Sequence, residues 1–334
     1  NIYGKAEFLN PGGSVKDRAA LALIKDAQEK KLISKGGTVV EGTAGNTGIG
    51  LGLLGNSLGY KTIIVMNDNQ TQEKKDLLKN LGAELRLVAP KPYKDDNNFV
   101  KIAARLADEL RPSNNNGVIW ANQFDNLANR RAHIATTAPE IYQQSSGKVD
   151  AFICSVGTGG TLSGVSEGLR ALKPHIKIGL VDPFGSALHK YFTEGELLSE
   201  GSSISEGIGQ GRITENLRDL SVDVSFRVSD HAALNLIYDL LYEEGLSVGI
   251  SAGINMAGAL EMAKTLKKGS TVVTILCDHG MRYQSKIFNH DSKYPYAPAD
   301  GIIFLDLAIS YSWEPSQSHG LFLYILYCES IGSW

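Results

Sequence analysis

A lysine in the first turn of a predicted helix is the first candidate for chemistry. Residues 10–18 read Asn-Pro-Gly-Gly-Ser-Val-Lys-Asp-Arg, where the proline and glycines predict a turn and Ser14 with Asp17 forms a capping-box-like helix start. Lys16 then lies at the positive end of the helix dipole, which favours its neutral amine by about 0.3–1 kcal/mol. A neutral, partly buried lysine can condense with an aldehyde. The alternative is a surface lysine that happens to fall in a first turn.

The second candidate is the loop formed by residues 42–48. It reads Gly-Thr-Ala-Gly-Asn-Thr-Gly, follows a predicted strand from Thr38 to Val40 and opens a predicted helix. Backbone N–H groups at a helix N-terminus bind anions, so the loop suits a substrate α-carboxylate, with Asn46 able to reach a cofactor oxygen. The side chains that add donors are those of Thr43, Asn46 and Thr47. The alternative is a tight turn that uses glycine for positive φ.

The third candidate is the loop formed by residues 155–161, after the predicted strand Ala151 to Cys154. It reads Ser-Val-Gly-Thr-Gly-Gly-Thr. Successive glycines let backbone amides form a nest for a phosphate, and a helix is predicted to start at Thr161. The loop lacks the Gly-Lys-Ser/Thr ending of a Walker A motif. A purely structural turn is the alternative.

These loops indicate one cofactor rather than another. Gly50, Gly52 and Gly55 match the dinucleotide pattern, but Gly50 lies well past the turn in which the first glycine must stand. A phosphate cradle and an activated lysine on separate loops, without an evident carboxylate cluster for Mg²⁺, instead indicate pyridoxal 5′-phosphate (PLP). This cofactor needs a nest for its phosphate, a lysine for its aldehyde and a partner for its ring nitrogen. No Cys-x-x-Cys or His-x-x-x-His spacing predicts a metal site.

Strands and helices alternate along the chain. Apolar strand segments such as Lys61 to Met66 and Ser270 to Cys277 are separated by helical patterns such as Asn126 to Gln144. The alternation predicts an α/β fold of parallel sheets covered by helices on both faces. Ligands of such sheets bind beyond the carboxyl ends of strands. Three loops rich in small residues have that position, after Val40, Ser155 and Cys277.

With these motifs in this order, the chain from Ile2 to about Phe288 closely resembles the cysteine synthase family, also called O-acetylserine sulfhydrylases. These are PLP enzymes of fold type II, which is a tryptophan synthase β-like fold of two lobes, each a mostly parallel sheet flanked by helices. The extra residues around Lys91 to Asn116 are similar to a fungal branch of the family. The motifs that carry the resemblance are Asn-Pro-Gly-Gly-Ser-Val-Lys-Asp-Arg at 10–18, Thr-Ala-Gly-Asn-Thr-Gly at 43–48, Asn-Gln-Phe-Asp-Asn at 122–126, Gly-Thr-Gly-Gly-Thr at 157–161, Glu-Gly-Ile-Gly at 206–209 and Gly-Ile-Ser-Ala-Gly at 249–253.

The resemblance implies a role for several of these segments. Lys16 would carry the cofactor as a Schiff base and, once displaced by the amino acid, would take its Cα proton as general base. Gln123 would complete the substrate pocket, and Asn46 would also touch the ring hydroxyl of the cofactor. The substrate carboxylate would be held by Thr43, Ala44, Gly45, Asn46 and Thr47, and the cofactor phosphate by Gly157, Thr158, Gly159, Gly160 and Thr161.

The reaction that the resemblance implies is β-replacement, in which O-acetyl-L-serine and sulfide give L-cysteine. A cystathionine β-synthase-like replacement or a serine dehydratase-like elimination is the second interpretation. Dehydratases resemble Ser-x-Gly-Asn-His where this chain has Thr-Ala-Gly-Asn-Thr, which disfavours elimination. A PLP-binding protein without catalysis is the third interpretation, of another class.

Two positions depart from the family pattern. Ala44 stands where the family usually has a serine, so one hydroxyl donor is lost from the carboxylate loop. His279 aligns with the serine that faces the pyridine nitrogen in the family, and a neutral imidazole can donate or accept one hydrogen bond there. If Asp278 reached the ring instead, it would protonate the nitrogen and shift the chemistry toward other PLP reactions. A loop histidine without contact to the cofactor is the alternative.

Length and composition limit the remaining possibilities. The chain has 334 residues, 43% hydrophobic and 21% charged, as in a globular protein with two lobes. With 33 Lys and Arg against 36 Asp and Glu, the net charge of −3 predicts no nucleic-acid partner. We expect a large PLP-binding domain from residues 1–41 and 123–289, with its N-terminal part missing, and a small mobile substrate domain from residues 42–122. Residues 290–334 are expected to be an atypical, poorly structured tail.

The cysteine content and the ends of the chain bear on the compartment in which the protein works. Three widely spaced cysteines predict no disulfide framework, which favours a reducing, intracellular compartment. The chain begins at Asn1 within strand-like sequence, so a targeting segment would be missing and the choice between cytoplasm and mitochondrion stays open. The apolar runs of the tail are too short to span a bilayer. The resemblance also implies a homodimer.

Overall fold

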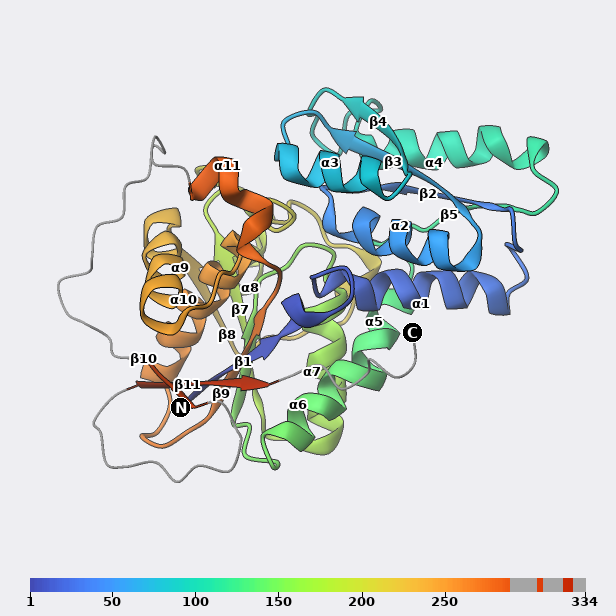
Figure 1. Cartoon of the computed structure of the whole chain (residues 1–334). Helices are drawn as coiled ribbons and strands as arrows, with labels where there is room; N and C mark the ends of the chain where they lie inside the picture. Colours follow the sequence, from blue (N-terminus) through green and yellow to red (C-terminus); the bar gives the residue numbers. More distant parts are fainter. Residues whose placement is uncertain (289–304, 309–320, 327–334) are drawn as a thin grey trace.

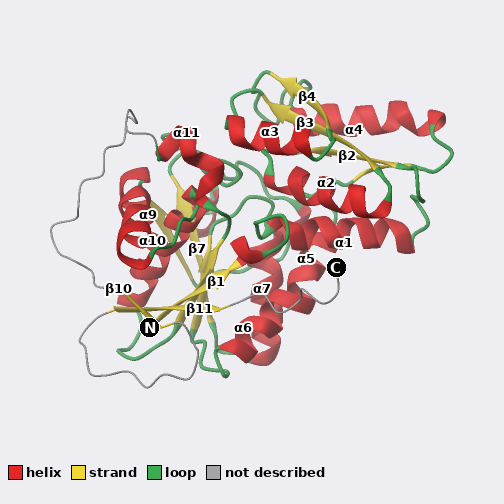
Figure 2. Ribbon diagram, viewed as in Figure 1, coloured by secondary structure: helices red, strands yellow, loops and turns green. Residues whose placement is uncertain are grey.

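Two parallel β-sheets organise the chain, each in its own lobe (Figures 1 and 2). The structure is a computed structural model that describes residues 1–288, 305–308 and 321–326. Within the described residues, the larger sheet comprises, in spatial order, β10 (Leu305–Ala308), β11 (Leu321–Leu326), β1 (Ile2–Ala6), β9 (Val272–Leu276), β6 (Ala151–Cys154), β7 (Lys177–Pro183) and β8 (Val224–Val228). The smaller sheet comprises β4 (Glu84–Val88), β3 (Lys61–Asn67), β2 (Thr38–Gly42) and β5 (Val118–Trp120).

Helices cover both faces of the larger sheet, because alternate residues of its strands point to opposite sides. Phe152 and Val273 are buried against α6, α7 and α8, whereas Ile153 and Val272 are buried against α9 and α10. The parallel α/β architecture predicted from the alternation is therefore confirmed. The helices of this lobe are α5 (Ala128–Ala132), α6 (Ala138–Gln144), α7 (Gly160–Leu172), α8 (Leu188–Glu194), α9 (Asp230–Glu244), α10 (Ile250–Lys264) and α11 (Gln284–Ile287).

The smaller sheet is likewise covered on both faces. Val39 is buried with residues of α1 and α2, and Ile64 with residues of α2 and α3, whereas Val40 and Val65 pack on α4. Helix α1 lies between the lobes and packs on α2 in the small lobe (Figure 1). The helices concerned are α1 (Lys16–Glu29), α2 (Asn46–Leu58), α3 (Gln72–Asn80) and α4 (Phe99–Leu110).

The glycines of the dinucleotide-like pattern have a packing role. Gly50 lies inside α2 and not in a turn, and a Cβ atom placed on it would lie 2.9 Å from the Cβ of Ala20 on α1. A Cβ atom placed on Gly55 would likewise collide with Thr62 Oγ1. Small residues at these positions let α2 approach its neighbours closely, which accounts for the pattern without a nucleotide.

Residue types that commonly end or cap helices stand at several helix ends. Gly59 has φ of 75° and ends α2, and the Ser229 hydroxyl accepts a hydrogen bond from Ala232 N at the start of α9 (3.2 Å). Thr71 precedes α3, but its side chain makes no capping hydrogen bond. The single helix predicted over residues 126–144 is divided, since one π-helical turn, His133–Thr137, lies between α5 and α6. Strand β8 and helix α8 carry no clear sequence signal.

The predicted boundary between residues 41 and 42 falls inside β2, all of which belongs to the small sheet. Of the predicted tail, β10 and β11 are described and extend the large sheet from β1, and the remaining residues from 289 onward lie outside the described residues.

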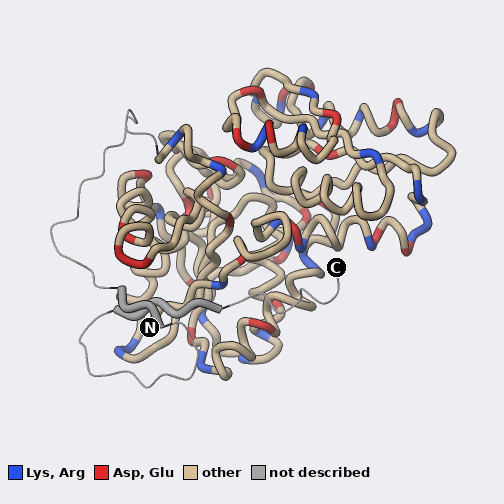
Figure 3. The backbone as a smooth tube through the Cα atoms, in the orientation of Figure 1, with Lys and Arg blue, Asp and Glu red and all other residues tan. Residues whose placement is uncertain are grey.

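In the described part of the chain, no helix has the length and apolarity to cross a bilayer. Figure 3 shows charges of both signs interspersed over both lobes.

Candidate active site

A cavity of about 450 Å³ lies where loops at the carboxyl ends of strands from both sheets meet. The loops after β2 and β3 line it from the small lobe, and the loops after β6 and β9 line it from the large lobe. Lys16, the residues of the 43–47 loop, Gln123 and most of the 157–161 loop share this cavity. Three segments that are far apart in the sequence and were each predicted to carry chemistry are therefore brought together.

Lys16 is the first residue of α1 and is half-buried at the cavity wall. The main chain on either side is fixed, since Val15 N donates to Cys277 O of the large lobe (2.8 Å) and Gly13 N donates to Asn10 O (2.7 Å). The predicted place of this lysine in a first helical turn is confirmed. Its side chain therefore starts from the N-terminal turn of α1 and reaches the cavity.

The buried carboxyl of Asp17 holds the turn that precedes Lys16. Its Oδ2 accepts from the N–H groups of Gly12 (2.8 Å) and Ser14 (3.4 Å), while the Ser14 hydroxyl accepts from Lys16 N (3.3 Å). The other oxygen, Oδ1, is buried without a hydrogen-bond partner among the described residues. Burial raises the pKa of Asp17 to about 7, against the effect of these hydrogen bonds. The capping-box-like start is thus present, although Val15 and not Ser14 precedes the first helical residue.

The loop formed by residues 43–47 is held from both lobes. Gly45 has φ of 135°, a conformation that requires glycine, and the helix α2 starts at the next residue. Thr47 Oγ1 donates to Gln123 Oε1 (2.5 Å), and Gln123 Nε2 donates to Gly42 O (3.1 Å). Asn46 Nδ2 donates to Asp278 Oδ2 (2.6 Å), which joins the loop to the large lobe. The loop presents a helix N-terminus to the cavity, as a carboxylate site requires.

The glycine-rich loop fits the phosphate of PLP. The loop opens helix α7, and several of its main-chain N–H groups have no hydrogen-bond acceptor among the described residues. These are the N–H groups of Gly157, Thr158, Gly159 and Thr161. Gly159 has φ of 92°, and a Cβ on Gly157 would collide with Gly207 O. Thr158 Oγ1 accepts from Asn129 Nδ2 (2.9 Å), which fixes the loop from behind. Unpaired N–H groups in a nest of this kind bind a phosphate.

The end of the cavity nearest β9 is lined by neutral groups. Cys154, Ser251 and Cys277 all reach it, and His279 does not. Burial raises the pKa of Cys277 to about 11 and that of Cys154 above its usual value, so both thiols stay protonated and unreactive at neutral pH. His279 is turned away, with its ring edge-to-face to Phe8 at 6.2 Å between centroids. The structure therefore gives no support to the predicted contact of His279 with the ring nitrogen.

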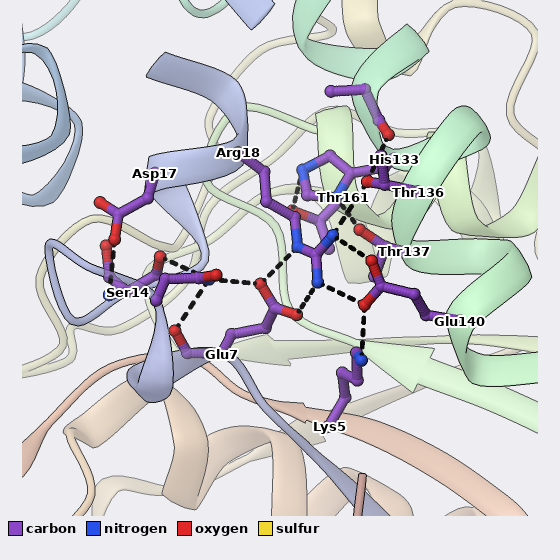
Figure 4. Close-up of polar contacts among 12 residues, drawn as sticks. Lys5, Glu7, Ser14, Asp17, Arg18, His133, Thr136, Thr137, Glu140 and Thr161 are labelled. Atoms are coloured by element: carbon purple, nitrogen blue, oxygen red, sulfur yellow. Dashed lines mark hydrogen bonds and ion pairs between the residues drawn. The ribbon is translucent and has the colours of Figure 1, made fainter. Parts of the chain in front are cut away.

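A buried network of charges supports the base of the Lys16 turn (Figure 4). Arg18 donates to Glu7 through Nε and Nη2 (2.8 Å each) and to both oxygens of Glu140 (2.8 and 2.7 Å), and Lys5 Nζ lies 2.7 Å from Glu140. Although burial opposes ionisation, the Arg18 and Lys5 cations hold the pKa of Glu140 below its usual value. Glu7 also accepts from Asn10 Nδ2 (2.8 Å), so the network reaches the turn itself.

His133, in the π-helical turn, links this region to the glycine-rich loop. Its Nε2 lies 3.2 Å from Thr161 Oγ1, and its Nδ1 lies 2.8 Å from Thr137 Oγ1. Burial, with the nearby positive charges of Arg18 and Lys16, lowers the pKa of His133 well below its usual value. A neutral imidazole between two hydroxyls fixes the orientation of the Thr161 side chain.

Sequence reasoning missed several residues of the site. Lys74 and Lys286 line the cavity, but each stands in an ordinary helical pattern that gives no signal. Glu206 and Ser251 also line it, and both belong to motifs that carry the family resemblance. Their presence in those motifs was the available signal, although it indicated no role.

Comparisons with known proteins agree with this geometry. Residues 1–278 match the family model described as pyridoxal-phosphate dependent enzyme. The chain is 53% identical over 294 residues to "Cysteine synthase 1" of Neurospora crassa, covering 86% of this chain and 77% of that protein. It is also 53% identical to "Cysteine synthase 1" of Emericella nidulans, with 86% and 78% covered. A solved structure, the O-acetylserine dependent cystathionine beta-synthase from Helicobacter pylori, superimposes with a TM-score of 0.76 at 34% identity, covering 86% of this chain and 90% of that one.

Proposed function

The chain belongs to the family of pyridoxal-phosphate dependent enzymes, in which it is a cysteine-forming member, and we propose that it converts O-acetyl-L-serine and sulfide to L-cysteine and acetate. One observation carries the proposal. Lys16, the 43–47 loop and the 157–161 loop line a single cavity, so an amine, a carboxylate site and a phosphate cradle are available to one bound cofactor and its substrate.

We propose the following roles for the residues of this site. The N–H groups of the 157–161 loop hold the cofactor phosphate, and Lys16 holds its aldehyde end. When bound, PLP supplies an electron sink for the substrate α-carbon. The 43–47 loop and Gln123 bind the substrate carboxylate and fix its orientation. Lys16 Nζ takes the Cα proton as general base.

The choice of substrates is tested by comparing four pairs. We expect the highest kcat/KM for cysteine formation from O-acetyl-L-serine and sulfide, with lower values for serine with sulfide and for either amino acid with homocysteine. A kcat/KM that is higher with homocysteine than with sulfide would favour cystathionine synthesis, a comparison suggested by the relative from Helicobacter pylori. A visible cofactor spectrum that never responds to O-acetyl-L-serine would favour a PLP-binding protein without catalysis.

For the ring nitrogen we propose Ser251 and Cys277 in place of His279. Both residues line the cavity and both side chains are uncharged, since burial raises the pKa of Cys277 to about 11. Two neutral groups leave the pyridine nitrogen without a charged partner. Asp278 does not line the cavity, and its Oδ2 accepts from Asn46 and from Tyr283 Oη (2.7 Å).

Substitutions at the two positions distinguish these assignments. We expect Ser251→Ala to shift the visible absorption maximum of the bound cofactor and to weaken PLP binding roughly 5-fold or more, since one hydrogen bond contributes about 0.5–1.5 kcal/mol. His279→Ala should leave both properties within roughly 2-fold, because the ring packs on Phe8, accepts from Met281 N in its own turn and does not line the cavity. The opposite ranking, measured by absorbance titration of the apoenzyme with PLP, would restore His279 to the site.

We also propose a homodimer, as the family resemblance implies, and an intracellular location in the cytoplasm or mitochondrion. The location is supported by Cys154 and Cys277, which are both free thiols. Light scattering during size-exclusion chromatography measures the first property, and imaging of the tagged protein in its own cells measures the second.

A further inference from the structure

Three charged side chains from both lobes meet at the cavity. Lys74 of α3 belongs to the small lobe, Glu206 to the loop between α8 and β8 of the large lobe, and Lys286 to α11. Glu206 Oε2 lies 2.7 Å from Lys74 Nζ, and Oε1 lies 2.8 Å from Lys286 Nζ. The side chains of Lys74 and Glu206 are only 2% and 5% exposed. All three residues line the cavity that contains Lys16.

Lys74 also supports the carboxylate loop from behind. A Cβ built on Gly45 would lie 2.8 Å from Lys74 Cδ and 3.3 Å from its Cγ, so the aliphatic stem of the lysine packs directly on the loop backbone. The ammonium end lies 4.3 Å from the centre of the Tyr283 ring, in the large lobe, in addition to its contact with Glu206. One side chain thus touches the loop with its stem and the opposite lobe with its charge.

Gln70 makes a second link between the 43–47 loop and Glu206. With its amide oriented to satisfy both neighbours, the nitrogen lies 3.1 Å from Ala44 O and 3.2 Å from Glu206 Oε2. Glu206 therefore receives donors from α11, from α3 and from the residue that holds the carboxylate loop. Ala44, the position at which this chain lacks the usual serine hydroxyl, is held here through its carbonyl.

Two of the contacts of Glu206, those with Lys74 and Gln70, join the lobes, whereas its contact with Lys286 lies within the large lobe. If α3 moved away from the large lobe, Lys74 would lose its carboxylate partner and Glu206 would keep Lys286, so the attraction between the largely buried charges of Lys74 and Glu206 favours the present arrangement. The ion pair therefore stabilises this arrangement together with the loop conformation that packs on Lys74. Breaking it should release both.

We propose that Lys74 and Glu206 are positioning residues, which hold the 43–47 loop in the conformation that receives the substrate carboxylate. The inference rests on the proposed role of that loop, and it adds the residues that keep the loop in place. Neither residue needs to touch the reacting atoms. The effect should consequently fall on amino-acid binding more than on the chemical step.

The test uses the PLP-loaded enzyme and charge-removing variants of similar shape. Lys74→Met keeps the stem on Gly45 and removes the charge, and Glu206→Gln keeps the side-chain shape. For both we expect the O-acetyl-L-serine concentration that half-saturates the change in visible spectrum, and KM, to rise roughly 10-fold, within the usual 5–150-fold range of coupling between two states, with kcat changed less. In the double variant the two effects should not multiply, because each substitution breaks the same pair.

The matched control is Glu73→Met on the same helix. Glu73 also joins the lobes, accepting from Ser285 N (2.6 Å) and Ser285 Oγ (2.9 Å), but it does not line the cavity or touch the loop. We expect a change of less than roughly 2-fold in half-saturation, as for an ordinary surface contact. Equal effects of Glu73→Met and Lys74→Met would show that lobe contact in general matters, and would overturn the specific role of Lys74.

Hydrogen exchange gives a measurement that needs no substrate. In Lys74→Met and Glu206→Gln, backbone amides of residues 43–48 should exchange roughly 10-fold faster than in the wild type, and those of α9 should be unchanged. Unaltered exchange in this loop overturns the proposal even if the enzyme proves inactive with O-acetyl-L-serine. A failure of the proposed function is seen separately, as a wild-type spectrum that does not respond to that amino acid.

Discussion

Lys16→Ala is expected to lower kcat/KM for cysteine formation by roughly 10³-fold or more. Proton transfer by a positioned general base contributes about 10²–10⁴-fold by itself, and this lysine is also proposed to hold the aldehyde end of PLP. The purified variant should therefore also lose the visible band of the lysine-bound cofactor. Steady-state kinetics and an absorption spectrum of the same sample measure both effects.

Lys25→Ala is the control for that experiment. Lys25 lies on the same helix, α1, but is exposed and far from the cavity lining, so activity and spectrum should match the wild type. Reduction with borohydride followed by peptide mapping should place the cofactor on Lys16 alone. A Lys16→Ala variant that retains the band, or a label found on another lysine, would contradict the assignment.

Arg18→Met is expected to destabilise the protein by about 3–5 kcal/mol, the usual effect of removing one partner from a buried ion pair. The Arg18 side chain is 3% exposed, and it lies between the carboxylates of Glu7 and Glu140, which are 0% and 10% exposed. Without the guanidinium, Lys5 is the remaining cation of the network, and it contacts Glu140 only through one oxygen. Chemical denaturation of the holoenzyme measures the loss.

A matched substitution on the surface shows whether burial is the cause. Arg131 lies 2.8 Å from Asp26 with a side chain that is 57% exposed, so Arg131→Met should change the free energy of unfolding by less than about 1 kcal/mol. Equal losses for the two variants would mean that the buried network is not special. Because Glu7 also holds Asn10 in the turn before Lys16, folded Arg18→Met protein should in addition bind PLP more weakly.

Lys16 was predicted from residues close to it in the sequence, whereas His279 was assigned from the family pattern alone. Lys16 follows a turn whose proline, glycines, Ser14 and Asp17 act within a few residues, so local rules placed it in a first helical turn correctly. His279 was assigned by its alignment in the family pattern. Its ring direction depends on Phe8, which is distant in sequence, and no local rule predicts that contact.

The amino-acid sequence by itself determined the alternation of strands and helices, the glycine-rich loop at residues 157–161 and the helix start at Lys16, because each depends on backbone conformation and hydrogen bonds between near neighbours. Only the tertiary structure decided that Lys74 and Glu206 form a buried pair across 132 positions, that the helix predicted over residues 126–144 contains a π-helical turn, and that neutral thiols line one end of the cavity. These features follow from how the two lobes and their helices pack, which sets distances between residues whose separation along the chain carries no such information.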